Sequence, residues 1–232
     1  MFAAVVLLPG MDGTGELFAP LLEHLYPDIE ATVVRYPDRR ASYAEHEAVA
    51  RHELPKDRPF LILGESFSGP VAVSIAANPP PNLRGLILCA SFLTCPNAWL
   101  RRLRPLAPFA TPKLVPDFIA HHSLLGRFAT PALRAAHAAA LRHVSSATLT
   151  ARLRAMAEID VREKLERVEV PSLYLRAAHD RVVAARYGDE FLRHARSGRL
   201  VEIDGPHFLL QTQPEKCARQ IAGFAGGLVT TG

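Results

Sequence analysis

Short apolar runs that alternate with helix-compatible stretches constrain the fold of this chain more than any other feature. Six such runs are bounded by Gly, Pro or charged residues, and they lie at residues 2–8, 31–35, 60–63, 85–90, 172–177 and 199–203. Their leucine and β-branched content is typical of strands that are buried on both faces. Helix-compatible stretches lie between them at 16–25, 43–53, 69–78 and 186–195. The alternation predicts an α/β fold with a doubly wound, mainly parallel sheet of about six strands.

The alternation is interrupted between about residues 95 and 167. Prolines stand at positions 96, 105, 108, 112, 116 and 131, and the sequence after them is rich in Ala, Leu and Arg, as helices are. Pro131 favours a helix start, and Ser146 or Thr148 can cap the helix that follows. We therefore expect a helical cap at about 95–167, inserted after the fourth strand of a single domain that spans residues 1–232.

Composition and charge disfavour several classes of protein. Of the 232 residues, 49% are hydrophobic, which suffices for one buried core. The formal net charge is +4, but acidic residues are mixed with basic ones, so a nucleic-acid-binding role is disfavoured. Residues 1–8 are apolar, lack a basic leader and run into Pro9, so we expect neither a signal peptide nor a membrane span.

The cysteines and histidines show no metal-ligand pattern. Cys89, Cys95 and Cys217 are odd in number, and Cys89 lies in an apolar run where a buried free thiol is the ordinary state. The histidines outside position 207 lack metal-type spacing. We expect no bound metal and a cytoplasmic location in a reducing compartment.

The strongest functional signal is the hexapeptide GESFSG at residues 64–69. It directly follows the predicted strand at 60–63 and directly precedes a helical run. A sharp strand-to-helix turn strains the backbone of its central serine and requires small residues two positions away, here Gly64 and Ser68. The N-terminus of the helix stabilises negative charge that develops beside Ser66. The hexapeptide therefore indicates a nucleophilic serine at Ser66.

Two alternatives fit the same hexapeptide. Ser66 can be a helix cap in an ordinary tight turn, without a catalytic role. Ser68 can be the nucleophile, but Pro70 would then occupy the position that requires a small residue.

A glycine-rich loop with the sequence PGMDGTG follows the first predicted strand at residues 9–15. Its three glycines allow the backbone to approach a reacting carbonyl closely. The loop lacks the Lys and Ser/Thr that end a phosphate-binding loop, and its glycine spacing differs from a dinucleotide-binding fingerprint. Nucleotide binding is therefore disfavoured.

Two further loops carry an acid and a histidine. Asp180 follows the predicted strand at 172–177, and His207 follows the strand at 199–203 in the turn GPHF. Loops that follow parallel strands meet at one edge of the sheet. Asp180 can instead pair with Arg181 or cap a helix. Of the other candidate acids, Asp160 is more typical of a helix cap, and Asp204 lies so near His207 in sequence that a local loop bond is its simpler use.

The order Ser66, Asp180, His207, with each residue after a predicted strand, resembles the α/β-hydrolase superfamily of serine hydrolases. Within it the chain is similar to small bacterial carboxylesterases, including pimeloyl-acyl-carrier-protein methyl ester esterase-like enzymes. The resemblance covers nearly the whole chain, without the first two edge strands of the family. The departure from the family's Gly-x-Ser-x-Gly pattern is Ser68 in place of the last glycine.

The resemblance implies a role for each of these residues. Ser66 is expected to attack an acyl carbonyl, His207 to remove its proton, and Asp180 to orient the histidine. By the same resemblance, the backbone N–H groups of Met11 and Phe67 form the oxyanion hole, and no cofactor is required. The expected activity is that of a carboxylesterase working through an acyl-enzyme. An acyltransferase or thioesterase on acyl-carrier substrates, and a slow-turnover ligand sensor, remain alternatives.

The substrate pocket and partner are predicted from residues near these loops. Four aromatic residues are candidates for a wall around a medium acyl chain or for ordinary core positions, and they are Phe18, Phe92, Trp99 and Phe208. Eight arginines in the cap form either a face for an acidic acyl carrier protein or a solvated surface, and they are Arg101, Arg102, Arg104, Arg127, Arg134, Arg142, Arg152 and Arg154.

Overall fold

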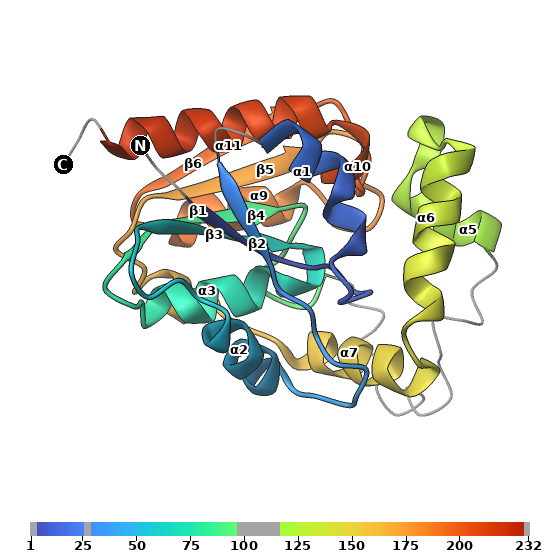
Figure 1. Ribbon diagram of the computed structural model, residues 1–232, viewed down its shortest axis with the longest axis horizontal. Coiled ribbons are helices and arrows are strands. Elements are labelled where there is room, and N and C mark those ends of the chain that lie inside the picture. Colours follow the sequence, from blue (N-terminus) through green and yellow to red (C-terminus); the bar gives the residue numbers. More distant parts are fainter. Residues whose placement is uncertain (1–3, 26–28, 97–116, 230–232) are drawn as a thin grey trace.

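The computed structural model describes residues 4–25, 29–96 and 117–229, and its centre is a sheet of six parallel strands (Figure 1). The strands are β1 Ala4–Leu8, β2 Glu30–Val33, β3 Phe60–Glu65, β4 Leu83–Cys89, β5 Ser172–Ala177 and β6 Gly198–Ile203. Their order is β2-β1-β3-β4-β5-β6, and every neighbouring pair runs parallel. The predicted doubly wound α/β fold is confirmed, and each predicted strand is present with its ends shifted by a few residues.

Side chains alternate between the two faces of the sheet and divide the interior into two clusters. Val5 and Leu7 of β1 face a cluster that includes residues of α1 and α11, whereas Val6 and Leu8 face a cluster built with α2, α3 and α9. Because both faces are covered, β1 is a continuous apolar run, and β3 is apolar from Phe60 to Leu63.

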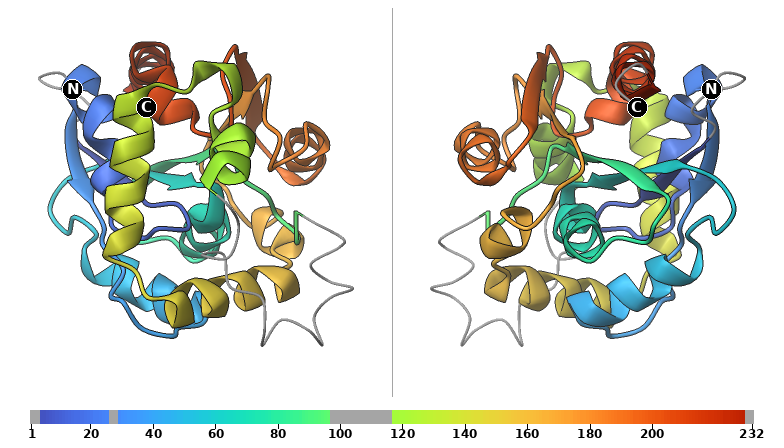
Figure 2. Two further views of the ribbon diagram at one scale, coloured as in Figure 1. Left: turned by 90° about the vertical axis from the view of Figure 1, so that its right-hand side faces the viewer. Right: turned by 90° about the vertical axis from the view of Figure 1, so that its left-hand side faces the viewer.

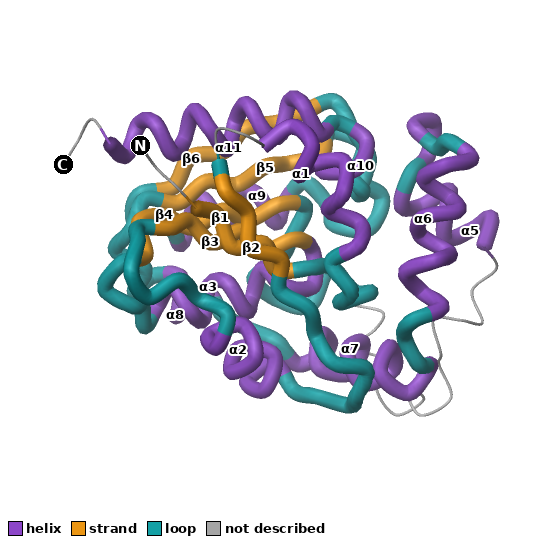
Figure 3. The backbone as a smooth tube through the Cα atoms, in the orientation of Figure 1, coloured by secondary structure: helices purple, strands orange, loops and turns teal. Residues whose placement is uncertain are grey.

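Helices form a layer on each side of the sheet, as Figures 1 and 3 show. One layer contains α1 (Ala19–Leu25), the short α10 (Leu209–Thr212) and α11 (Pro214–Val229). The other contains α2 (Tyr43–His52), α3 (Gly69–Ala77), α8 (Arg162–Leu165) and α9 (Arg186–His194). The 3-10 turns η1 (Glu16–Phe18) and η2 (Ser66–Ser68) lead into α1 and α3.

The order of the strands reverses between β1 and β3, which makes this the topological switch point of the sheet. The chain passes from β1 to β2 on one side and then returns to add β3 on the other side of β1. Loops that leave the carboxyl ends of two such strands diverge, and ligands bind in the crevice between them. The pairing of Leu8 with Gly64 places the glycine-rich loop after β1 beside the turn after β3.

The described part of the segment between β4 and β5, which we call the cap, is largely helical. It contains α5 (Asp117–Leu124), the 3-10 turn η5 (Gly126–Phe128), α6 (Pro131–Arg142) and α7 (Ser146–Glu158). The helices α5 and α6 lie beyond one end of the sheet (Figures 1 and 2). Ser145, rather than Ser146 or Thr148, caps α7, because its extended backbone lets its hydroxyl accept the N–H of Thr148.

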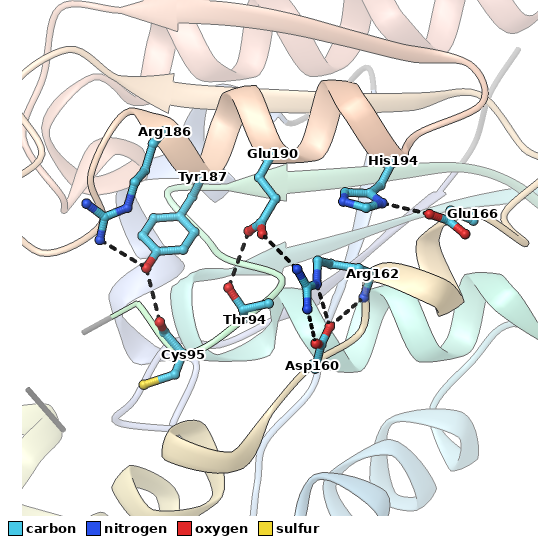
Figure 4. Close-up of polar contacts among 9 residues, drawn as sticks. All are labelled: Thr94, Cys95, Asp160, Arg162, Glu166, Arg186, Tyr187, Glu190 and His194. Carbon is cyan, nitrogen blue, oxygen red and sulfur yellow. Dashed lines mark hydrogen bonds and ion pairs between the residues drawn. The ribbon is translucent and has the colours of Figure 1, made fainter. Parts of the chain in front are cut away.

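The two connections of the cap meet at a neck, which we define as Thr94, Cys95 and Asp160. Thr94 and Asp160 form an isolated antiparallel bridge. Figure 4 shows how α9 contacts this neck: the Tyr187 hydroxyl donates to the Cys95 carbonyl at 3.0 Å, and Glu190 faces Thr94. The cap is therefore fastened to the helix layer by side chains of α9.

Gly64 offers a test of how tightly the turn after β3 is packed. A Cβ atom at Gly64 would lie 2.6 Å from the Ser68 carbonyl oxygen and 2.8 Å from Gly69 Cα, so no side-chain rotation relieves the contacts. We expect Gly64→Ala to lower the free energy of unfolding in urea by about 3 kcal/mol. Gly223→Ala in α11 is the matched control, because its Cβ would meet nothing within 4 Å. It should raise stability by roughly 0.5–1 kcal/mol; similar losses in both variants would contradict the packing argument.

Candidate active site

Ser66 has the strained backbone that the hexapeptide predicts. Its φ is 47°, a left-handed value that a residue with a side chain rarely adopts. It stands between the end of β3 and α3, and its side chain is partly exposed while Phe67 and Ser68 are buried. Ser68, the alternative nucleophile, has its hydroxyl bonded to Tyr36 and to the Pro9 carbonyl in the interior.

Ser91, for which the sequence analysis predicted no role, supports the turn at Ser66 through a hydrogen bond to its backbone. Its hydroxyl donates to the Ser66 carbonyl at 2.6 Å, and its own carbonyl accepts from the Tyr174 hydroxyl. A Cβ at Gly69 would lie 1.8 Å from the Ser91 hydroxyl oxygen, so glycine is required there. Ser91 reaches this position from the end of β4, where Ala90 has a φ of 46°.

The structure brings Ser66, His207 and Asp180 into one hydrogen-bonded chain. Ser66 Oγ lies 3.0 Å from His207 Nε2, and His207 Nδ1 lies 2.8 Å from Asp180 Oδ2. The other Asp180 oxygen accepts the N–H groups of Val182 and Val183, both at 2.8 Å. The side chains of His207 and Asp180 are each 5% exposed. With Nδ1–H donating to the held carboxylate, Nε2 is the acceptor that faces the Ser66 hydroxyl.

The surroundings of His207 favour its protonated form. Burial by itself lowers the pKa of His207, but the charge and hydrogen bond of Asp180, with the charge of Glu65, outweigh burial and raise it above 6.5. The Asp180 carboxylate therefore makes the imidazole a stronger base toward the Ser66 proton.

The other two candidate acids do not contact His207. Asp204 is 58% exposed, and it pairs with Arg127 at 3.0 Å and with His179 at 2.8 Å. Asp160 pairs with Arg162 beside the cap neck. Among the three acids considered from the sequence, the structure places only Asp180 on the histidine.

The glycine-rich loop lies next to Ser66. A Cβ built on Gly10 would lie 4.0 Å from the Cβ of Ser66. The Gly10 carbonyl accepts the N–H of Gly13 at 3.1 Å, and in a trans peptide this turns the N–H of Met11 the opposite way. Phe67, the other predicted donor, directly follows Ser66 in η2. The two predicted oxyanion donors thus come from segments that flank the Ser66 side chain.

Glu65, immediately before Ser66, is a buried acid that sequence reasoning missed. It accepts the side-chain N–H of Gln211 at 2.9 Å, and its Oε2 would lie 3.7 Å from a Cβ built on Gly10. Burial raises the pKa of Glu65 to about 7, and Asp12 contributes in the same direction against the lowering effect of Gln211, His207 and the Gly10 backbone. No local pattern marks this position, because Gln211 and Gly10 approach it only in the folded chain.

The predicted pocket residues occupy different environments. Phe92 is buried in a small cluster with Met156, Val183 and Tyr187, against which Met11, Leu153 and Ile159 pack. We call these seven residues the Phe92 cluster. Phe18 is buried in the sheet core with Val5 and Leu7, so its ring belongs to the interior. Phe208 is half-buried, its N–H bonds to the Leu124 carbonyl of the cap, and Trp99 lies outside the described residues.

The cap arginines also divide. Arg127, Arg134, Arg142 and Arg154 are exposed, whereas Arg101, Arg102 and Arg104 lie outside the described residues. Arg152 is 1% exposed and points into the protein, so the expectation that it belongs to a surface face is wrong for this residue. Its guanidinium instead bonds to the carbonyls of Met11 and Asp12.

Among the described residues, no group of three His, Cys, Asp or Glu side chains is arranged to hold a metal ion. None of the helices in residues 4–25, 29–96 and 117–229 has the length and hydrophobicity needed to cross a membrane.

The fold and the loops at its carboxyl edge define the class of α/β hydrolases. The family model described as serine aminopeptidase, S33, matches residues 42–206, and the chain belongs to this family of α/β hydrolases. A curated relative, 3-oxoadipate enol-lactonase 1 of Acinetobacter baylyi (strain ATCC 33305 / BD413 / ADP1), is 34% identical over 71 residues. That match covers 31% of this chain and spans only 27% of the relative's length.

Solved structures of other α/β hydrolases share the fold. A bromoperoxidase from Bacillus anthracis superposes with a TM-score of 0.82 and 15% identity, covering 97% of this chain and 92% of the other. An esterase from Exiguobacterium antarcticum gives a TM-score of 0.81 and 16% identity, with the same coverage of 97% and 92%. At these identities the likeness concerns the fold alone.

Glu65 makes the stability of the protein depend on pH. Because its pKa is about 7 when folded and 4.5 ordinarily, the folded protein binds more protons between these values. The free energy of unfolding therefore falls as the pH rises through this range. The measured quantity is the free energy of unfolding of Glu65→Gln minus that of wild type, from urea unfolding. We expect this difference to be more favourable to the variant at pH 8 than at pH 5 by about 3 kcal/mol.

Glu23→Gln in α1 is the matched control, because Glu23 is exposed. Its stability relative to wild type should be the same at both pH values. If the stability of Glu65→Gln relative to wild type is also the same at pH 5 and pH 8, the buried carboxyl does not titrate in this range.

Proposed function

We propose that this protein is a serine carboxylesterase with Ser66 as nucleophile, His207 as general base and Asp180 as the orienting acid. The observation that carries the proposal is the chain of hydrogen bonds from Ser66 through His207 to Asp180, which begins at a serine with a φ of 47°. Membership of an α/β-hydrolase family supports it independently.

The geometry supports a two-stage reaction. His207 Nε2 accepts the Ser66 proton as Oγ attacks the acyl carbonyl, and Asp180 stabilises the resulting imidazolium. The N–H groups of Met11 and Phe67 donate to the oxygen that becomes negative. His207 then returns the proton to the leaving alcohol. A water molecule, activated by the same histidine, hydrolyses the acyl-enzyme, and no cofactor takes part in these steps.

The surroundings of Ser66 favour an apolar acyl group. The Phe92 cluster combines residues of the oxyanion loop, the segment after β4, helix α7 and the loop of Asp180. Its partly buried members, including Met11, offer apolar surface beside the predicted oxyanion hole. A lactone, which is a cyclic ester, is a second candidate substrate, because a curated relative is an enol-lactonase.

Ser66→Ala tests the central claim with p-nitrophenyl esters of increasing acyl length and with a simple lactone. Loss of the nucleophile should lower kcat roughly 10⁶-fold, as expected when a member of such a triad is removed. The circular dichroism spectrum should be unchanged, because the Ser66 side chain is partly exposed.

Ser68→Ala is the control for the alternative nucleophile, and it should keep most of the turnover of wild type. If Ser68→Ala loses activity and Ser66→Ala does not, Ser68 rather than Ser66 is the nucleophile. If the protein hydrolyses amino-acid p-nitroanilides but no ester, its substrates are peptides rather than esters. Preferential transfer of the acyl group to an added alcohol would indicate an acyltransferase.

We also propose that the cap binds an acidic acyl carrier protein. Arg134 and Arg142 are exposed on α6, a helix without a single Asp or Glu. Positive charge on one helix increases the rate of encounter with an acidic partner at low ionic strength.

Reversal of both charges in Arg134→Glu/Arg142→Glu should slow hydrolysis of a carrier-bound ester by about tenfold at low salt. It should leave a small soluble ester unaffected, because the side chains of Arg134 and Arg142 are exposed on the surface of α6. The measurement is kcat/KM for both substrates at two ionic strengths. Equal activity of the variant and wild type on the carrier-bound ester would contradict the docking proposal.

A further inference from the structure

Arg152 of the cap helix α7 reaches the loop that follows β1. It is 1% exposed, and its Nη1 donates to the Met11 carbonyl at 2.9 Å and to the Asp12 carbonyl at 2.8 Å. Bonds from a charged donor are stronger than those between neutral groups. The cap, 140 residues further along the sequence, is therefore bonded directly to the backbone that carries a predicted oxyanion donor.

The guanidinium is held between Gly13 and Tyr36. A Cβ at Gly13 would lie 2.5 Å from Arg152 Nη1 and 2.7 Å from its Cζ, so any side chain there would displace the guanidinium. Gly13 also has a φ of 70°, which favours glycine independently. On another side, Arg152 Cζ lies 5.8 Å from the centre of the Tyr36 ring.

These contacts fix the directions of successive peptide groups. The N–H and C=O of a trans peptide point in opposite directions. The Gly10 carbonyl is held by the N–H of Gly13, which sets the direction of the Met11 N–H. The Met11 carbonyl is held by Arg152, which sets the direction of the Asp12 N–H. With both carbonyls held, the φ and ψ angles of Met11, which join the two peptide groups, are restricted as well.

The same loop also lies against the nucleophile turn. The Oε2 of Glu65, which precedes Ser66, would lie 3.7 Å from a Cβ built on Gly10. Residues 10–12 thus lie between the Glu65 carboxyl of the nucleophile turn and the Arg152 guanidinium of the cap, which bonds to two of their carbonyls. A change in the position of α7 would act on this loop through Arg152.

The contribution of Arg152 to the stability of the fold does not by itself explain an arginine at this position. Within the described residues, Arg152 Nε and Nη2 are buried without a hydrogen-bond partner. Buried donors without partners are unfavourable, and an apolar side chain of similar length avoids that cost.

We infer that Arg152 is a positioning residue that sets the geometry of the oxyanion hole from the cap. The inference rests on the proposed esterase function and deepens it, because it makes the cap a structural part of the catalytic site. Arg152 acts through Met11 and does not itself touch the substrate.

Arg152→Met tests the inference, and Arg154→Met is the matched control, because Arg154 is an exposed arginine of the same helix. For Arg152→Met we expect kcat on a p-nitrophenyl ester to fall about 10²-fold with KM nearly unchanged, as for the loss of one oxyanion donor. Affinity for a trifluoromethyl ketone, which forms a tetrahedral adduct with the serine, should fall in parallel. Arg154→Met should match wild type in all three quantities.

A second measurement does not depend on turnover. Hydrogen exchange of the amides of residues 10–13 should be faster in Arg152→Met than in wild type and Arg154→Met. If Arg152→Met does not fold, Arg152→Lys replaces it. Its kcat should still fall, because an ammonium does not reproduce the planar guanidinium, but it should fall less, because the ammonium can donate to one of the two carbonyls.

Wild-type kcat, ketone affinity and amide exchange in a folded Arg152 variant would overturn the inference. So would a uniform loss of kcat, ketone affinity and thermal stability that Arg154→Met shares. If wild type itself lacks esterase activity and Ser66 does not react with a fluorophosphonate, the proposed function fails. The exchange measurement then still decides whether Arg152 holds the loop.

Discussion

The left-handed backbone of Ser66, at a φ of 47°, is the constraint on which the rest of the site depends. Such a conformation persists only when its surroundings hold it. Here β3 and α3 enclose the turn, Gly64 permits their close approach, and the Ser91 hydroxyl holds the Ser66 carbonyl. The strain places the Ser66 side chain at the carboxyl edge of the sheet, where the other loops of the site meet.

The parallel sheet is what makes that meeting possible. Segments that follow β1, β3, β5 and β6 emerge at the same edge, so residues far apart in sequence become neighbours. The interactions there are charged and buried: Asp180 uses both oxygens, one for His207 and one for the backbone of its own loop. Arg152 extends this arrangement into the cap and connects a helix outside the sheet layers to the backbone beside Ser66.

Much of the fold followed from local patterns in the sequence, and the predicted roles of Ser66, Asp180 and His207 followed from the resemblance to α/β hydrolases. Strands buried on both faces need continuous apolar runs, and the turn after β3 needs small residues, so both leave a visible signal. The choice of Asp180 over Asp204 was less local, and the structure shows its basis in the pairing of Asp204 with Arg127 and His179. The catalytic roles of these residues, and the two backbone donors, stay predictions.

By itself, the sequence determined the order of strands and helices, the turn at Ser66, and the loops that carry Asp180 and His207. Only the tertiary structure decided that Ser91 supports the nucleophile, that Gln211 meets Glu65, and that Arg152 leaves the cap surface for the oxyanion loop. The physical reason is range: periodicity and glycine requirements act between near neighbours in the chain. A buried hydrogen bond across 141 residues, such as that of Arg152 with Met11, depends on packing that no local pattern records.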